Sequence, residues 1–163
     1  LGEAVRELLL EFRDDDWDTM IEVLLFNAAR RPLIAKHIGR LTTAGMWVGS
    51  DRTFLSSIVY QGHARGELAM TSLITNATVQ GYKPDLLMVV LADVKTALSR
   101  QIKPDRIGSE DFEFHKLVMN GFRQEALERR LPIIDGDVPL EQVYEQAWLI
   151  AKPHVEHYLE KKR

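Results

Sequence analysis

The chain has 163 residues, of which 45% are hydrophobic and 28% are charged, a composition typical of a globular domain with a sizeable core. Its formal net charge of -3 argues against the broad basic field of a nucleic-acid-binding protein, so an anion site would need locally placed arginines. The lack of cysteine excludes disulfides and thiolate metal sites, and no apolar run approaches the roughly 18 residues of a membrane span. We therefore expect neither nucleic acid nor a membrane as a partner and, by default, a cytoplasmic location.

Apolar residues at helical spacing fill the first part of the chain and predict three helices. Pro32 disfavours helical geometry at Arg31, so the second helix should end or kink there, and a third should follow. Gly45 should stop the third helix. These helices are predicted over residues 1–12, 19–30 and 33–44.

Three short apolar runs predict buried strands. The first is Met46–Val48, which ends in Ser50-Asp51-Arg52. Leu86–Leu91 is an uninterrupted apolar run, the pattern of a parallel strand that is covered on both faces. Leu131–Asp135 is the third. Because helical patterns alternate with these runs, the sequence predicts an α/β fold with a parallel sheet.

The helices of the second half have clear start and stop signals. Ser109 should cap the longest of them, and Pro139 should lie in the first turn of the last one. Pro153 should kink or end that last helix. The predicted ranges are 66–80, 94–101, 109–130 and 139 onward.

An acid–base pair, Asp51 and Arg52, directly follows the first predicted strand. Open α/β sheets bind ligands beyond the carboxyl ends of their strands, and the planar fork of arginine suits a phosphate group. Ser57, Tyr60 and Gln61 follow at near-helical spacing. From these residues alone, a structural ion pair that ties the strand end is an equal alternative.

Five segments of the chain resemble the thymidylate kinase family, and they occur in the family order. The stretch Asp51-Arg52-x4-Ser57-x2-Tyr60-Gln61-Gly62-x2-Arg65-Gly66 is similar to the family's Asp-Arg…Ser…Tyr-Gln-Gly…Arg-Gly signature. The other four resembling segments are Leu24–Arg30, Pro84–Leu86, Asp105–Ile107 and Ile133–Asp135.

The resemblance implies one kinase-like domain over residues 1–163, with a three-layer parallel sheet and helices on both faces, as in P-loop nucleoside monophosphate kinases. It implies transfer of the γ-phosphate of ATP to dTMP, giving dTDP for dTTP synthesis, with Mg²⁺ as cofactor. It also implies a homodimer, for which the apolar helices of Thr19–Ala44 offer a face.

On the dTMP side, the resemblance implies roles for individual side chains. Phe26 would stack on thymine, and Arg30, on the same helix face, would bond a thymine carbonyl. Ser57 would lie near the base, Tyr60 would lie under the sugar, and Gln61 would support the same wall. The alternatives are core packing for Phe26 and a surface salt bridge for Arg30.

The resemblance also implies the residues of phosphate transfer. Arg52 would hold the dTMP phosphate, and Asp51 would orient it or a magnesium-bound water. Arg106 would be a further catalytic arginine. The family has an acidic residue where this chain has Gly108, so the carboxylate linked to the metal is in doubt, and Glu113 is the nearby candidate that we name beside Asp51.

On the ATP side, the segment from Arg100 to Arg106 occupies the position of the family's lid. Arg100 would flank adenine, and Asp135 would border the adenine pocket. No G-x-x-x-x-G-K-[ST] phosphate loop occurs in the chain. We therefore expect that an N-terminal strand–loop–helix unit and the next strand are missing, and that the chain by itself does not catalyse transfer.

Two other functions remain open at this point. The chain could be a catalytically silent thymidylate kinase-like protein that binds only a nucleotide or a partner. It could also be a kinase of the same fold that acts on another monophosphate, although Phe26, Arg30 and Tyr60 argue against that alternative.

Overall fold

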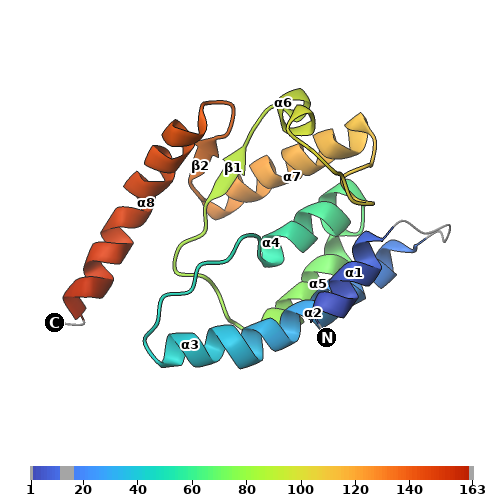
Figure 1. Ribbon diagram of the computed structural model, residues 1–163. Coiled ribbons are helices and arrows are strands. Elements are labelled where there is room, and N and C mark those ends of the chain that lie inside the picture. Colours follow the sequence, from blue (N-terminus) through green and yellow to red (C-terminus); the bar gives the residue numbers. More distant parts are fainter. Residues whose placement is uncertain (1, 12–16, 162–163) are drawn as a thin grey trace. The chain divides into compact units, whose positions relative to one another are not determined.

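The computed structural model describes residues 2–11 and 17–161, which form two compact units (Figure 1). Unit 1 comprises residues 1–83 and 102–121, and unit 2 comprises residues 84–101 and 122–163. In the described ranges, every helix is too short or too polar to cross a membrane.

Unit 1 is built on three packed helices, α1 (Gly2–Leu10), α2 (Thr19–Pro32) and α5 (Leu68–Val79). Helix α2 lies between the other two and contacts both (Figure 1). The Asp18 side chain caps α2 by accepting a hydrogen bond from the Met20 amide at 2.8 Å. Leu9 of α1 and Val23 of α2 are both fully buried, so the packing of α1 on α2 forms part of the core of unit 1.

Helix α2 ends at Pro32, close to the predicted break at Arg31, but the chain stays helical beyond it. The chain continues through a π-helix, η1 (Leu33–Ile38), into α3 (Gly39–Thr43). Proline removes one amide donor and crowds the preceding turn, and a π-helical turn accommodates such a local mismatch without breaking the path. Gly45 then ends α3 with a positive φ of 67°, so the predicted stop is confirmed.

The strand predicted at Met46–Val48 is wrong. Residues 46–50 form irregular backbone, and Met46 and Trp47 are about half exposed, at 52% and 47%. An apolar run becomes a strand only when a neighbouring strand pairs with its backbone. The sheet found in the described part of the chain consists of two other segments.

After this irregular segment, the chain forms α4 (Phe54–Ser57) and a second π-helix, η2 (Ile58–Ala64). Leu55, Ile58 and Val59 are buried here and extend the core of unit 1. Gly66 turns the chain into α5 with a positive φ of 84°.

Unit 2 contains a two-stranded parallel sheet. Strand β1 (Val89–Leu91) pairs with β2 (Ile133–Asp135), with Val90 opposite Ile134. The parallel pairing confirms the predicted parallel sheet, although β1 is shorter than the apolar run Leu86–Leu91. The unit also contains α6 (Val94–Ser99).

Helix α7 (Phe112–Arg129) belongs to unit 1 up to Gly121 and to unit 2 beyond it. Asp111, rather than the predicted Ser109, caps it by accepting a hydrogen bond from the Phe114 amide at 2.8 Å. Both residue types are good caps, so spacing alone could not choose between them.

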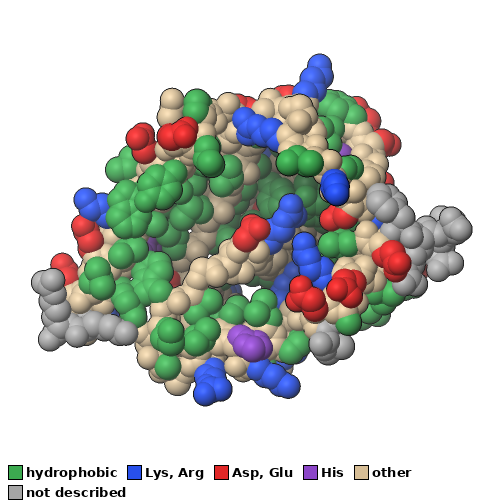
Figure 2. Space-filling view, viewed as in Figure 1, with side chains coloured by type: hydrophobic (Ala, Val, Ile, Leu, Met, Phe, Trp, Pro, Cys, Tyr) green, Lys and Arg blue, Asp and Glu red, His purple; other side chains and the backbone are tan. Residues whose placement is uncertain are grey.

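The last helix, α8 (Leu140–Lys161), passes through Pro153 without ending there. Hydrophobic side chains stand exposed along α8, and acidic and basic side chains are interspersed over the visible face (Figure 2). Tyr144 and Leu149 of α8 are 66% and 71% exposed.

Gly121 permits a close approach of α7 to η2. A Cβ atom on Gly121 would lie 2.9 Å from Cβ of His63 and 3.1 Å from Cγ1 of Val59. We predict that Gly121→Ala destabilises the protein, because forcing these helices apart costs about 1–3 kcal/mol. That cost exceeds the gain of about 0.5–1 kcal/mol in helix propensity.

The control for this prediction is Gly49→Ala. An added Cβ at Gly49 has no other atom within 4 Å, so the substitution should leave the free energy of unfolding nearly unchanged. Urea denaturation of both variants makes the comparison. Equal midpoints would show that the α7–η2 contact is not tight.

Candidate functional site

Arg30, in the last turn of α2, is a largely buried cation whose hydrogen-bond partners are neutral. Its guanidinium donates to Oδ1 of Asn27 at 2.9 Å and to Oγ of Ser57 at 2.8 Å, with a longer bond of 3.4 Å to the Thr53 carbonyl. Burial lowers the pKa of Arg30 to about 10. It therefore stays charged at neutral pH, and this charge can attract a carbonyl or an anion.

The same contact joins two of the predicted binding residues. Arg30 comes from α2 and Ser57 from α4, and their hydrogen bond brings these segments together. Phe26, one turn before Arg30 on α2, is half-buried. Core packing, the alternative role for Phe26, is therefore only partly supported by its burial.

Arg52 lies over the ring of Tyr60, with 5.4 Å between its guanidinium carbon and the ring centroid. Desolvation lowers the pKa of Arg52. The hydroxyl of Tyr60 and the carboxylates of Asp51 and Asp105 act against it, and together they raise the pKa above its ordinary value. The predicted residues Asp51, Arg52 and Tyr60 thus lie within electrostatic reach of one another.

The backbone of Arg52 has a positive φ of 64°. For a residue with a Cβ atom, this left-handed conformation costs about 1–2 kcal/mol. Strained backbone persists where the surroundings hold it, and it is frequent at sites that bind ligands.

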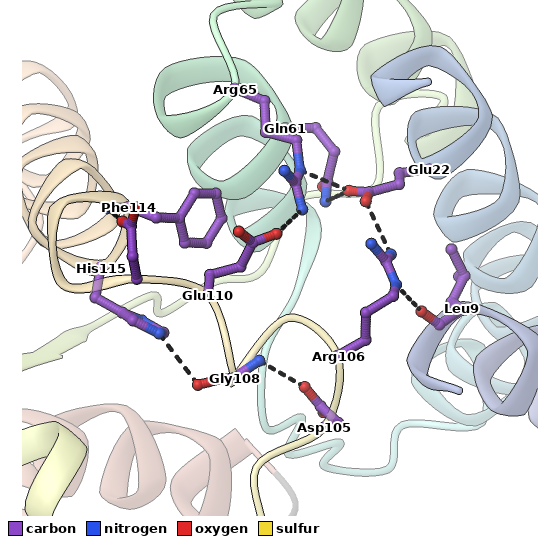
Figure 3. Close-up of polar contacts among 11 residues, drawn as sticks. Leu9, Glu22, Gln61, Arg65, Asp105, Arg106, Gly108, Glu110, Phe114 and His115 are labelled. Atoms are coloured by element: carbon purple, nitrogen blue, oxygen red, sulfur yellow. Dashed lines mark hydrogen bonds and ion pairs between the residues drawn. The ribbon is translucent and has the colours of Figure 1, made fainter. Parts of the chain in front are cut away.

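A second polar cluster surrounds Glu22, a fully buried residue of α2 (Figure 3). One of its carboxylate oxygens accepts hydrogen bonds from Nε2 of Gln61 at 3.0 Å and from Nε of Arg65 at 3.1 Å. The other oxygen accepts from the Arg106 guanidinium at 2.8 Å. Glu22 therefore connects α2 to η2, to the turn after η2, and to the loop before α7.

The loop before α7 has further contacts in the same region (Figure 3). Nε of Arg106 donates to the Leu9 carbonyl at 3.0 Å, and its backbone amide donates to the Leu10 carbonyl at 3.3 Å. Arg65 pairs with Glu110 at 2.6 Å. The predicted catalytic Arg106 is thus an anchor of its own loop in this structure, and its catalytic role stays a prediction.

The two predicted metal carboxylates do not gather into a metal site. Asp51 is exposed, and Glu113, whose side chain is 70% exposed, pairs with Lys116 at 3.2 Å. Within the described ranges, no three His, Cys, Asp or Glu side chains are arranged to hold a metal ion. The residues present thus do not form a magnesium site among themselves.

In unit 2, the structure brings together the two residues predicted for the ATP side. Arg100 donates from its guanidinium to the Gly136 carbonyl at 2.6 Å, directly after Asp135. The Asp135 carboxylate accepts a hydrogen bond from the Asp137 amide at 2.9 Å. The end of β2 therefore turns sharply, with Arg100 fixed beside it.

Glu22 is the functional candidate that sequence reasoning missed. It lies one turn before Phe26 and two turns before Arg30 on the same helix face, so the spacing was available as a signal. A single acid on a helix is more often exposed, and its partners were not visible from α2 alone.

Comparison with known proteins agrees with the motifs. The family model of thymidylate kinase matches residues 1–147. A thymidylate kinase of Marinomonas sp. (strain MWYL1) is 39% identical over 152 residues, which cover 90% of this chain and 72% of the relative. Those of Shewanella amazonensis and Sulfurihydrogenibium sp. (strain YO3AOP1) are 34% and 32% identical, each covering 88% of this chain and 72% of the relative. The chain therefore belongs to the thymidylate kinase family.

Proposed function

We propose that this protein acts as a thymidylate kinase, using ATP and dTMP as substrates and giving ADP and dTDP for dTTP synthesis. The family match supports the activity. The observation that carries the placement of dTMP in unit 1 is Arg30, a largely buried guanidinium with neutral partners beside Ser57. Such a group can donate to a thymine carbonyl without first breaking an ion pair.

Arg30 and Phe26 would bind the base, with Ser57 beside it. Tyr60 and Gln61 would form the side of the pocket under the sugar, the sugar wall. Gln61 is buried and held by Glu22, and Tyr60 is the residue before it. Arg52, over the Tyr60 ring, would hold the phosphate. Its fork can bind two phosphate oxygens at once.

In the transfer, an oxygen of the dTMP phosphate forms a bond to the γ-phosphorus of ATP while the bond to the β–γ bridging oxygen breaks. Catalysis of this step depends mainly on alignment and on positive charge around the transferred group. Arg52 would supply that charge, and Asp51 would orient the phosphate. Arg106 is a candidate for a second cation. Arg100 and Asp135 would border adenine. Mg²⁺ is used by the family, but in the described residues Asp51 and Glu113 do not form a site that would hold it.

We propose further that both units belong to one thymidylate kinase-like domain, because the family match crosses both. The family implies the P-loop nucleoside monophosphate kinase fold. A three-layer sheet with covered faces is supported by the parallel pairing of β1 with β2, since parallel sheets are almost always covered on both sides. A crystal structure in which one face of this sheet is bare would contradict that arrangement. A cytoplasmic location stays a prediction, to be checked by cell fractionation.

The first prediction from this proposed function concerns the base and the sugar. We expect dTMP to bind about fivefold better than dUMP, because one buried methyl group contributes roughly 1 kcal/mol. UMP should bind more weakly still, since its 2′-hydroxyl would meet the Tyr60 wall. Calorimetric titration of the three nucleotides measures this order, and equal affinity for UMP and dTMP would refute the pocket.

The second prediction concerns Arg52. Arg52→Lys should weaken dTMP binding roughly 10- to 150-fold, the loss expected for a charge-assisted contact of about 1.5–3 kcal/mol. Thymidine, which lacks the phosphate, should bind as before. Lysine keeps the charge and the left-handed backbone cost, so the comparison isolates the planar fork.

The matched control for Arg52→Lys is Arg31→Lys, because Arg31 bonds the Thr78 carbonyl and the Gln80 side chain instead. It should leave dTMP affinity unchanged. If Arg52 only pairs with Asp51, the lysine variant will retain wild-type affinity, and the phosphate-binding role will be wrong.

The third prediction concerns oligomeric state. We propose a homodimer through α2 and α5, which contact each other and expose large apolar side chains such as Leu24 and Leu73, at 52% and 65%. Leu73→Glu should give a monomer in light scattering at a concentration at which the wild type is a dimer. Leu127→Glu is the control, because Leu127 is equally exposed, at 69%, but lies in the unit 2 part of α7. A wild type that scatters as a monomer would contradict the dimer.

A further inference from the structure

Glu22 has a position that the binding roles of the other residues do not explain. It is fully buried, yet it carries a carboxylate with three hydrogen-bond donors from three segments. A charged group is costly to bury unless partners replace its lost water, and removing one partner of such a group is strongly destabilising. Glu22 therefore holds the three segments that carry its donors in place.

The first donor segment contains the sugar wall. Gln61 is buried within η2, and its amide donates to Glu22 at 3.0 Å. Tyr60 is the preceding residue, and Arg52 lies over its ring. A shift of Gln61 would consequently move the wall and the contact to Arg52.

The second donor segment is the loop before α7 (Figure 3). Arg106 pairs with Glu22, and the residue before it is Asp105. The Asp105 carboxylate is one of the groups that raise the pKa of Arg52. Glu22 thus holds the loop that completes the electrostatic surroundings of Arg52.

The cluster also balances its own charge. Glu22 and Glu110 neutralise Arg65 and Arg106, with contacts between 2.6 and 3.1 Å. Arg30, on the same helix as Glu22, keeps neutral hydrogen-bond partners. The fold therefore separates two arginines used for internal anchoring, Arg65 and Arg106, from Arg30, which can meet a ligand.

We propose that Glu22 is the positioning residue of the dTMP site. Without touching the nucleotide, its carboxylate fixes the Tyr60–Gln61 wall and the Asp105–Arg106 loop around the bound nucleoside. The inference rests on the proposed function, and it adds a residue and a mechanism of positioning to it.

The test is calorimetric titration of the 163-residue protein with dTMP and with thymidine. Glu22→Gln keeps the shape of the side chain but removes its charge, so both ligands should bind at least about tenfold more weakly, the equivalent of losing one well-placed hydrogen bond. Loss of affinity for thymidine is the distinguishing result, because Arg52→Lys should affect dTMP alone.

Glu125→Gln is the matched control. Glu125 is also a buried carboxylate, 4% exposed, and it pairs with Arg129 at 2.6 Å in unit 2. Both variants should melt at lower temperature than the wild type, but only Glu22→Gln should lose affinity. Wild-type affinity in a folded Glu22→Gln protein would overturn the inference and leave only a structural role.

A second variant keeps the test decisive if Glu22→Gln does not fold. Glu22→Asp retains the charge but withdraws the carboxylate by one methylene group, so both ligands should again bind more weakly. Unchanged affinity in that variant would overturn the inference. If the unaltered protein binds neither ligand, the proposed function itself fails, which is a separate outcome.

Discussion

The burial of one carboxylate, that of Glu22, constrains much of unit 1. A buried charge must be given partners, and here those partners come from η2, from the turn after it and from the loop before α7. Hydrophobic packing joins α2 to α1 and to α5. Hydrogen bonds have a preferred geometry, and the one from Gln61 to Glu22 holds η2 against α2.

Arg30 illustrates the opposite use of a buried charge. Its neutral partners hold the guanidinium in place but do not cancel its charge, and burial alone lowers its pKa. Glu22 and Arg30 lie two turns apart on α2, so a single helix carries an anion paired with arginines and a cation whose hydrogen-bond partners are neutral. This division between internal support and ligand contact is what a preorganised binding site requires.

Much of the helical content could be predicted from periodicity, since apolar spacing reports directly on which face of a helix is buried. Pro32 marks the end of α2 as its local rule predicts. Local rules failed elsewhere: Pro153 lies inside the continuous helix α8, and Met46–Val48 lacks the strand geometry that its composition suggests. The motif residues from Asp51 to Gln61 could be named because they are close in sequence. The partners of Glu22 lie 39, 43 and 84 residues away, and no local pattern encodes such pairings.

The π-helix η2 (Ile58–Ala64) has a consequence for how this chain can vary in length. A π-helical turn has the register of an α-helix into which one residue has been inserted. Deleting one residue there would allow an ordinary α-helix and leave the following residues in nearly the same orientation, whereas a deletion from an ordinary α-helix rotates the following side chains by about 100° around the axis. Arg65, which follows the segment, would keep its direction towards Glu22. The π-helical turn therefore allows this segment to vary in length by one residue without turning the residues that follow it.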